Sequence, residues 1–232
     1  MQRPASVIPM LSQKDLISPT ATRRAVEQTT SCFYGSSGND RFTAKQTYSN
    51  IKGDGGGNNS AVLNGSTGVD KFYALTPHSY IRADDNSYYN YVRGFNSVTA
   101  NAVGIGDLAF MYGSDGNDVL NANSTSAAFT LNPTTGGQVV NTAAAFDNVY
   151  AYATGGGIDT ANLTGTTVDD AFKGDADWGY LRSKGSSDYF NYVRYFDEVF
   201  ADPGDSDVGN DDLDDLGVSY TLNSDPGNGN VW

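Results

Sequence analysis

Residues that build common catalytic and metal centres are nearly missing from this chain. It holds one cysteine, Cys32, one histidine, His78, and two glutamates, Glu27 and Glu198. A single cysteine excludes an internal disulfide, and one cysteine with one histidine excludes a Cys/His zinc cluster. The same scarcity argues against a nucleophile paired with histidine. We therefore expect no catalytic residues and no enzyme.

Long apolar runs are absent as well. No stretch approaches the roughly 20 residues that a helix needs to cross a membrane. Residues 1–15 also lack the continuous hydrophobic core of a secretory signal peptide. We expect no membrane span and no cleavable signal within these residues.

Basic residues are few, with 14 Lys and Arg against 27 Asp and Glu, for a formal net charge of −13. Such an acidic chain argues against nucleic acid as a partner, because nucleic acid selects for basic patches. All the acidic residues except Glu27 and Glu198 are aspartates. Aspartate is favoured in tight turns and is also a hard oxygen ligand for cations. Its abundance fits either role.

What the chain does contain is a repeat. A glycine-rich octapeptide, which ends in aspartate, any residue and a hydrophobic residue, occurs at residues 35–42, 65–72, 113–120 and 165–172. Glycines permit backbone angles that other residues avoid, so we read the phrase as a tight turn leading into a strand. Its carboxylates are Asp40, Asp70, Asp118 and Asp170.

A short alternating strand is expected before three of these turns, at residues 59–63, 107–111 and 159–163. These segments are spaced 48 and 52 residues apart. In each, an alanine and a larger Leu or Met stand two residues apart and are expected to point inward. Later in the unit, residues 91–98 match residues 192–199, whereas the middle unit keeps only part of this pattern. The first and third units therefore resemble each other more than either resembles the second.

These patterns predict an all-β protein, a parallel β-helix or solenoid built from repeats of about 50 residues. Each unit would form two coils of roughly three strands. A β-propeller of four-stranded blades is the alternative, because a blade has a similar length. The solenoid would cover residues 32–232, with a truncated first and a degenerate last repeat. Residues 1–31 are net basic and would form a leader, a cap or a linker.

The repeated turn resembles the glycine- and aspartate-rich nonapeptide of RTX (hemolysin-type) calcium-binding proteins. The differences are that Ser or Thr stands at the family's second glycine and that the copies are not in tandem. The resemblance implies Ca²⁺ bound by aspartate carboxylates and backbone carbonyls, and it implies export through an uncleaved C-terminal signal. The alternative is that each aspartate only hydrogen-bonds its own turn. The candidate ligands are first Asp40, Asp70, Asp118 and Asp170, and second Asp107 and Asp159.

A second acidic cluster spans residues 202–212. Asp205 and Asp207 have the one-residue gap of an EF-hand loop, but the glycine falls one place early and Leu216 stands in place of the closing glutamate. The segment is therefore not an EF-hand. Repulsion among its carboxylates favours either a bound cation or disorder.

Tyrosine is in excess, with 15 residues. Tyr88, Tyr89 and Tyr91 form an aromatic stripe beside Arg93, and the segment around Tyr192 repeats it. An exposed stripe would stack on sugars, whereas a buried one would belong to the core. We favour packing, because half of a strand's side chains face inward.

Together these features predict a secreted structural or adhesive module, extracellular or at the cell surface, stabilised by calcium. Its basic start and its acidic segment 202–215 would favour head-to-tail self-association into filaments or a surface layer. The alternative is a carbohydrate-binding or carbohydrate-active β-helix with a polysaccharide partner. Exposure of the tyrosine stripe would distinguish the two.

Overall fold

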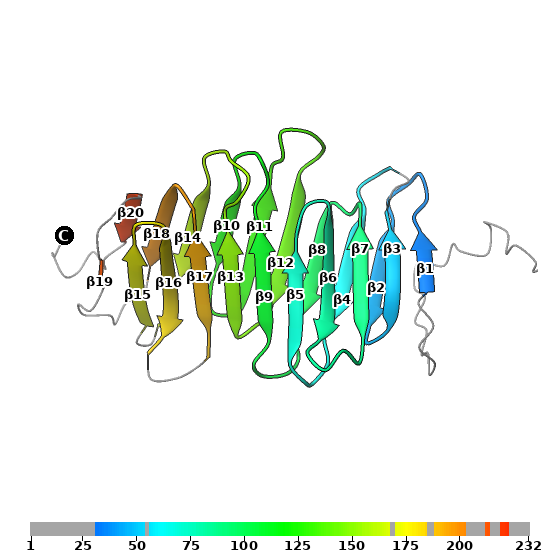
Figure 1. The fold of residues 1–232 in the computed structure, drawn as a ribbon, viewed down its shortest axis with the longest axis horizontal. Helices are drawn as coiled ribbons and strands as arrows, with labels where there is room; N and C mark the ends of the chain where they lie inside the picture. Colours follow the sequence, from blue (N-terminus) through cyan, green and yellow to red (C-terminus); the bar gives the residue numbers. More distant parts are fainter. Residues whose placement is uncertain are drawn as a thin grey trace, which may run out of the picture.

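The computed structural model describes residues 31–53, 56–167, 170–184, 188–202, 212–213 and 219–222. These residues form strands and turns and no helix, so nothing in the described chain is a helix that could cross a membrane. The strands build two sheets that run along an elongated body (Figure 1). The predicted leader lies outside the described residues, apart from Ser31, which begins the first strand.

The two sheets, sheet A and sheet B, are listed here in spatial order. Sheet A contains β1 (Ser31–Tyr34), β3 (Tyr48–Lys52), β7 (Tyr89–Arg93), β6 (His78–Ala83), β5 (Asp70–Ala74), β9 (Leu108–Tyr112), β13 (Asn148–Tyr152), β17 (Phe190–Arg194), β16 (Trp178–Ser183), β15 (Asp170–Asp175) and β19 (Asp212–Leu213). Sheet B contains β2 (Arg41–Lys45), β4 (Ser60–Asn64), β8 (Ser97–Asn101), β12 (Val139–Ala144), β11 (Ser126–Leu131), β10 (Val119–Ala122), β14 (Thr160–Thr164), β18 (Glu198–Asp202) and β20 (Ser219–Leu222).

The chain passes from one sheet to the other and winds into a β-solenoid, which confirms the predicted fold class. Neighbouring strands are mostly parallel, but each repeat contains a three-stranded meander. After β4, for example, β5 enters sheet A without pairing with β3, the previous strand of that sheet. Strands β6 and β7 then turn back and fill the space between β5 and β3. Strand β7 then pairs with β3, and β5 pairs with β9. The strands form two continuous sheets instead of separate blades, which excludes the propeller.

The expected coil of three strands, one on each of three sides, is wrong, because the described strands alternate between only two sheets. One repeat instead contains five strands, of which the middle one of the meander runs antiparallel to its neighbours. Five is odd, so consecutive repeats place their meanders on opposite sheets: β5–β7 in A, β10–β12 in B and β15–β17 in A. The first and third repeats resemble each other because both place their meander in sheet A, whereas the second repeat places it in sheet B.

The core lies between the two sheets and is filled by every second residue of each strand. The predicted inward pairs are confirmed, since Ala61 with Leu63, Ala109 with Met111 and Ala161 with Leu163 are all buried. Alanines dominate the inner row of sheet B, where Ala100, Ala143, Ala127 and Ala122 lie opposite one another across the strands. A polar link also crosses the core, since Ser79 Oγ of sheet A donates to Asn141 Oδ1 of sheet B at 3.1 Å.

Phe129 tests this assignment of faces, because its side chain is fully buried while its neighbour Thr130 points outward on the same strand, β11. We expect Phe129→Ala to lower the free energy of unfolding by about 3–5 kcal/mol and Thr130→Ala by roughly 0.5 kcal/mol at most. Chemical denaturation of both variants measures the difference. Equal losses would contradict the register, because a slip of one residue exchanges the two faces.

Candidate functional site

The aspartate of each glycine turn binds the turn itself. Asp118 is buried, and its carboxylate accepts hydrogen bonds from Ser114 Oγ at 2.7 Å and from the backbone N–H groups of Ser114 and Asn132 at 2.5 and 2.8 Å. Asp40, Asp70 and Asp170 receive the same pair of donors, a backbone N–H and a hydroxyl, from the Ser or Thr four residues earlier. The Ser or Thr at the second position of the turn thus serves as a hydroxyl donor to the aspartate.

The first glycine of the turn makes room for that carboxylate. A Cβ added to Gly65 would lie 2.5 Å from Asp70 Oδ2. The equivalent Cβ on Gly35 would lie 2.6 Å from Asp40 Oδ2, and both distances are closer than real Cβ contacts. Glycine, hydroxyl residue and aspartate therefore form one hydrogen-bonded unit that fixes the start of the next strand.

A second set of polar residues ties neighbouring strands together at these corners. Asp118 N–H donates to Asp159 Oδ1 at 2.7 Å, and Asp159 N–H donates to Asp197 Oδ2 at 2.8 Å. The same contacts link Asp70 to Asp107 and Asp107 to Asp147. In the first repeat the acceptors are asparagines, Asn59 and Asn96, in place of aspartates. Each corner side chain thus accepts a hydrogen bond from the backbone N–H of the corresponding residue at the start of a neighbouring strand.

The aspartate corners place buried carboxylates close to one another. Burial raises the pKa of Asp159 to about 6, and repulsion from Asp118 and Asp197 acts in the same direction. Burial likewise raises the pKa of Asp107. The hydrogen bonds from Asp118 N–H and Asp70 N–H oppose these two shifts. The hydrogen bonds therefore stabilise the corners, whereas burial and like charge disfavour the ionised carboxylates of Asp107 and Asp159 near neutral pH.

These carboxylates, as they stand, do not form a calcium cage. Ca²⁺ takes six to eight oxygens, whereas the carboxylate of Asp118 already accepts three hydrogen bonds. Among the described residues, no three His, Cys, Asp or Glu side chains form a group that could hold a metal ion. An ion at a corner would have to displace hydrogen bonds, so calcium stays a prediction. Asp205 and Asp207 lie outside the described residues.

The tyrosine stripe divides between core and surface. Tyr88 and Tyr189 are buried, as expected for packing. Tyr89, Tyr91 and Tyr192 are half-buried and point outward from sheet A.

Outward positions on strands β3 to β15 of sheet A are mostly aromatic or basic, and Asp175 is the one acidic side chain among them. We call this surface the aromatic face. Its aromatic residues are Tyr48, Tyr73, Tyr80, Tyr89, Tyr91, Phe110, Tyr112, Tyr150, Tyr152, Trp178, Tyr180, Phe190 and Tyr192. Its basic residues are Lys52, Lys71, Arg82, Arg93, Lys173, Arg182 and Arg194.

Rings of the aromatic face stack on one another along the solenoid. One ladder runs across consecutive strands, with ring centroids 4.7 Å apart for Tyr73–Tyr80, 4.9 Å for Tyr73–Phe110 and 5.3 Å for Phe110–Tyr150. These distances follow from the strand spacing of roughly 4.7–4.9 Å. Within the ladder the ring faces cover each other, so ring edges and hydroxyl groups meet the solvent.

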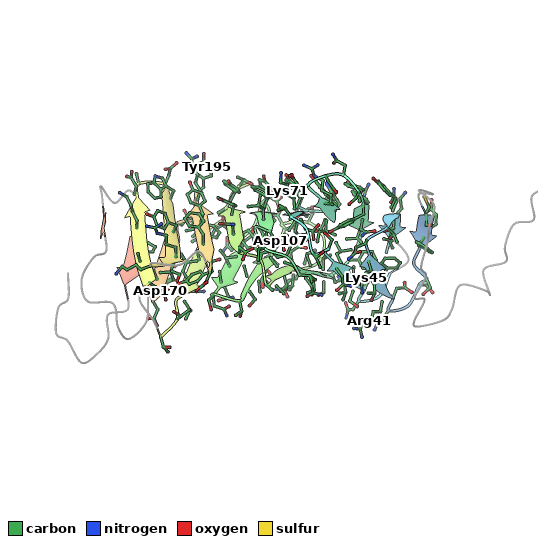
Figure 2. All side chains as sticks on the ribbon, turned by 90° about the horizontal axis from the view of Figure 1, so that it is seen from below. Arg41, Lys45, Lys71, Asp107, Asp170 and Tyr195 are labelled. Atoms are coloured by element: carbon green, nitrogen blue, oxygen red, sulfur yellow. The ribbon has the colours of Figure 1, made fainter. Side chains whose placement is uncertain are left out.

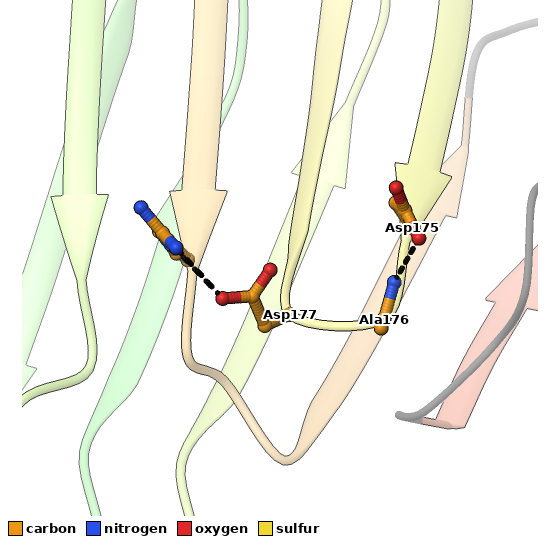
Figure 3. A network of polar contacts seen from close by, with 4 residues as sticks. Asp175, Ala176 and Asp177 are labelled. Carbon is orange, nitrogen blue, oxygen red and sulfur yellow. Dashed lines mark hydrogen bonds and ion pairs between the residues drawn. The ribbon is translucent and has the colours of Figure 1, made fainter.

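Lys71 and Arg194 of this face form ion pairs with carboxylates in adjacent turns. Lys71 pairs with Asp84 at 2.6 Å. Arg194 pairs with Asp177, in the turn between β15 and β16, at 2.9 Å (Figure 3). The opposite surface of the molecule carries Arg41 and Lys45, on strand β2 of sheet B (Figure 2).

A shallow depression of about 200 Å³ lies at one end of the aromatic face. Tyr48, Asn50, Tyr89 and Tyr91 line it, with Ser49 behind them. All five residues come from the neighbouring strands β3 and β7.

Sequence reasoning found the tyrosines of the first and third repeats but missed those of the second. Phe110, Tyr112, Tyr150 and Tyr152 complete the ladder between the two similar units. The signal was available, because aromatic residues alternate within residues 108–112 and 148–152. The missing element was the five-strand repeat, which places β9 and β13 in sheet A beside the meanders of the repeats on either side.

The comparisons with known proteins add no family: no protein-family model, no curated protein and no solved structure matches this chain.

The Asp159 corner predicts a pH dependence of stability. The folded-state pKa of about 6 lies above the usual 3.8, so stability from the protonated carboxyl is complete below pH 4 and is lost as pH rises from about 4 to 6. Asp159→Asn removes this loss while keeping the acceptor, as Asn59 does for Asp40. We expect the variant to gain on the order of 2 kcal/mol over the wild type at pH 7 and little at pH 4.

Thermal melting of both proteins between pH 3.5 and 7.5 checks this expectation. The difference between the two melting temperatures isolates Asp159, because every other carboxyl titrates in both proteins. A constant difference across the range would contradict the raised pKa.

Proposed function

We propose that this chain is a secreted adhesive module whose aromatic face binds an acidic polysaccharide. The observation that carries the proposal is the composition of that face. The protein has a net charge of −13, yet the described outward positions of β3 to β15 carry seven basic residues and one acidic residue. Such segregation of charge favours a polyanionic partner at this surface.

The aromatic content favours a sugar polymer. Tyrosine and tryptophan side chains combine apolar rings with polar tips, which suits ligands that have both apolar and hydroxyl-bearing surfaces. Strands spaced roughly 4.7–4.9 Å apart place these side chains at regular intervals. An extended polysaccharide also presents its sugar units at regular intervals. A contiguous outward-facing surface of this kind, with half-buried rings, favours an interaction site.

Two other partners fit less well. A second copy laid face to face would bring the basic residues of both molecules together, which is unfavourable. A nucleic acid would meet a strongly acidic molecule outside this face, which opposes its approach.

The outer face of sheet B differs from the aromatic face, because small side chains such as Thr99, Thr142 and Ala128 lie side by side there.

Binding of polygalacturonate, measured by isothermal titration calorimetry, tests the proposal. We expect the double variant Arg82→Gln/Arg182→Gln to bind about 5- to 30-fold more weakly than the wild type, at roughly 0.5–1 kcal/mol for each exposed charge contact. Both arginines point outward from sheet A. We also expect affinity to fall as salt is added.

The matched control is Arg41→Gln/Lys45→Gln, which removes the same charge from exposed positions of sheet B and should change affinity by about twofold at most. Equal losses in the two double variants would show that binding depends on net charge and would contradict a binding face. Absence of binding by the wild type, or tighter binding of a single-stranded oligonucleotide, would overturn the polysaccharide proposal.

Calcium stabilisation forms a separate part of the proposed function, supported by the RTX-like turns and the repulsion at the aspartate corners. An ion that binds only the folded state adds roughly 2.7 kcal/mol at a hundredfold excess over its dissociation constant. We expect chelator to lower the melting temperature and Asp118→Ala to weaken the response to calcium. Superimposable melting curves of the wild type with calcium and with chelator would rule the ion out.

Self-association stays a prediction. Residues 1–30, 203–211 and 214–218, which hold most of the charge that would join the two ends, lie outside the described part of the chain.

A further inference from the structure

The aromatic ladder stops at the boundary between β7 and β3. The ring of Tyr89 stacks on Tyr80 at 5.2 Å, and the ring of Tyr91 stacks on His78 at 5.3 Å. Both partners belong to β6, on one side of β7. On the other side Asn50 lies opposite Tyr91 in the strand register. No ring contact joins the described residues of β3 to either tyrosine.

Asn50 is therefore a missing rung. From β7 to β16 the positions in this row are all aromatic: Tyr91, Tyr80, Tyr73, Phe110, Tyr150, Tyr192 and Tyr180. The smaller asparagine leaves the depression described above, with rings as its walls. The hydroxyl of Tyr48 donates to the carbonyl of Asn86, which holds one wall in place.

The size of the depression limits what can enter it. Its volume of about 200 Å³ is below the roughly 300–1,000 Å³ of pockets that take drug-sized ligands. One six-membered ring suits this space. The ring would lie against the side of Tyr91 that His78 does not cover, and it would extend the ladder by one rung.

Polar groups around the depression indicate the chemistry of that ring. The half-buried amide of Asn50 lines the depression, and an amide can both donate a hydrogen bond to a sugar hydroxyl and accept one from it. Lys52 and Arg93 are the next outward pair on the same two strands. Neither has a carboxylate partner within the described part of the chain, and Lys52 lies 5.5 Å from the centre of the Tyr34 ring.

We propose that this depression is a subsite for a single uronic acid ring of the polysaccharide. The pyranose ring stacks on Tyr91, one of its hydroxyls hydrogen-bonds to the amide of Asn50, and its carboxylate faces Lys52 and Arg93. This assignment rests on the proposed function and narrows it to uronate-containing chains. The rest of the aromatic face supplies edges, hydroxyls and cations along the polymer, and the subsite fixes one unit of it.

Asn50→Tyr tests the subsite by filling it. The new ring would occupy the gap and stack on Tyr91, so the variant is expected to fold and melt at or above the temperature of the wild type. We expect its affinity for a galacturonate hexasaccharide to fall at least tenfold. The matched control is Asn121→Tyr, which adds the same ring at an exposed outward position on β10 of sheet B, outside the aromatic face. It should bind as the wild type does.

A second pair of variants tests the chemistry. Tyr91→Leu keeps an apolar wall but removes the ring face and should weaken binding of the hexasaccharide. Lys52→Gln should weaken it as well, and should leave binding of a neutral glucose hexasaccharide unchanged. Equal effects of Lys52→Gln on both sugars would overturn the assignment of a uronate.

The outcomes separate this subsite from the proposed function. If Asn50→Tyr binds polygalacturonate and its hexasaccharide as the wild type does, the subsite is wrong and the binding face stands. If the wild type binds neither, both proposals are wrong. If Asn50→Tyr instead abolishes dimers seen by analytical ultracentrifugation, a second copy occupies the depression and the sugar assignment is overturned.

Discussion

The solenoid depends on carboxylates that are buried at its corners. A turn that reverses the chain between two sheets exposes backbone N–H groups, and a buried N–H without an acceptor is costly. Asp118 supplies acceptors within its own turn, and Asp159 supplies one for the strand beside it. Burial, and with it repulsion from Asp118 and Asp197, raises the pKa of Asp159, so its charged form is disfavoured near neutral pH. Corner geometry and pH sensitivity therefore have one origin.

The odd number of strands in a repeat has the widest consequence for the surface. Because five strands fill two sheets, consecutive repeats alternate their meanders between sheet A and sheet B. Aromatic residues can then gather on the outer face of sheet A alone. That face is built from the first and third meanders and from β9 and β13 of the second repeat, which lie between them. The outer face of sheet B keeps small side chains, and the molecule gains two chemically different sides.

The aromatic face also shows how packing and binding share the same side chains. Stacked rings such as Tyr73 and Phe110 stabilise the sheet by roughly 0.5–1.5 kcal/mol for each pair, and they shield each other's faces from any ligand. A ring face becomes available only where the ladder is interrupted. Asn50 interrupts the ladder, so the face of the Tyr91 ring on that side has no neighbouring ring in the register.

The sequence by itself determined the all-β class, the repeat, the turn at each aspartate and the inward pairs such as Ala61 and Leu63, because these depend on local backbone preferences and on the two-residue period of a strand. Only the tertiary structure decided which strands share a sheet, because a period of about 50 residues is compatible with three strands in a coil or with five in a repeat. That choice separated buried Tyr88 from outward Tyr89. It also brought Asn50 beside Tyr91, 41 residues away, through a hydrogen-bonded register that no local pattern records.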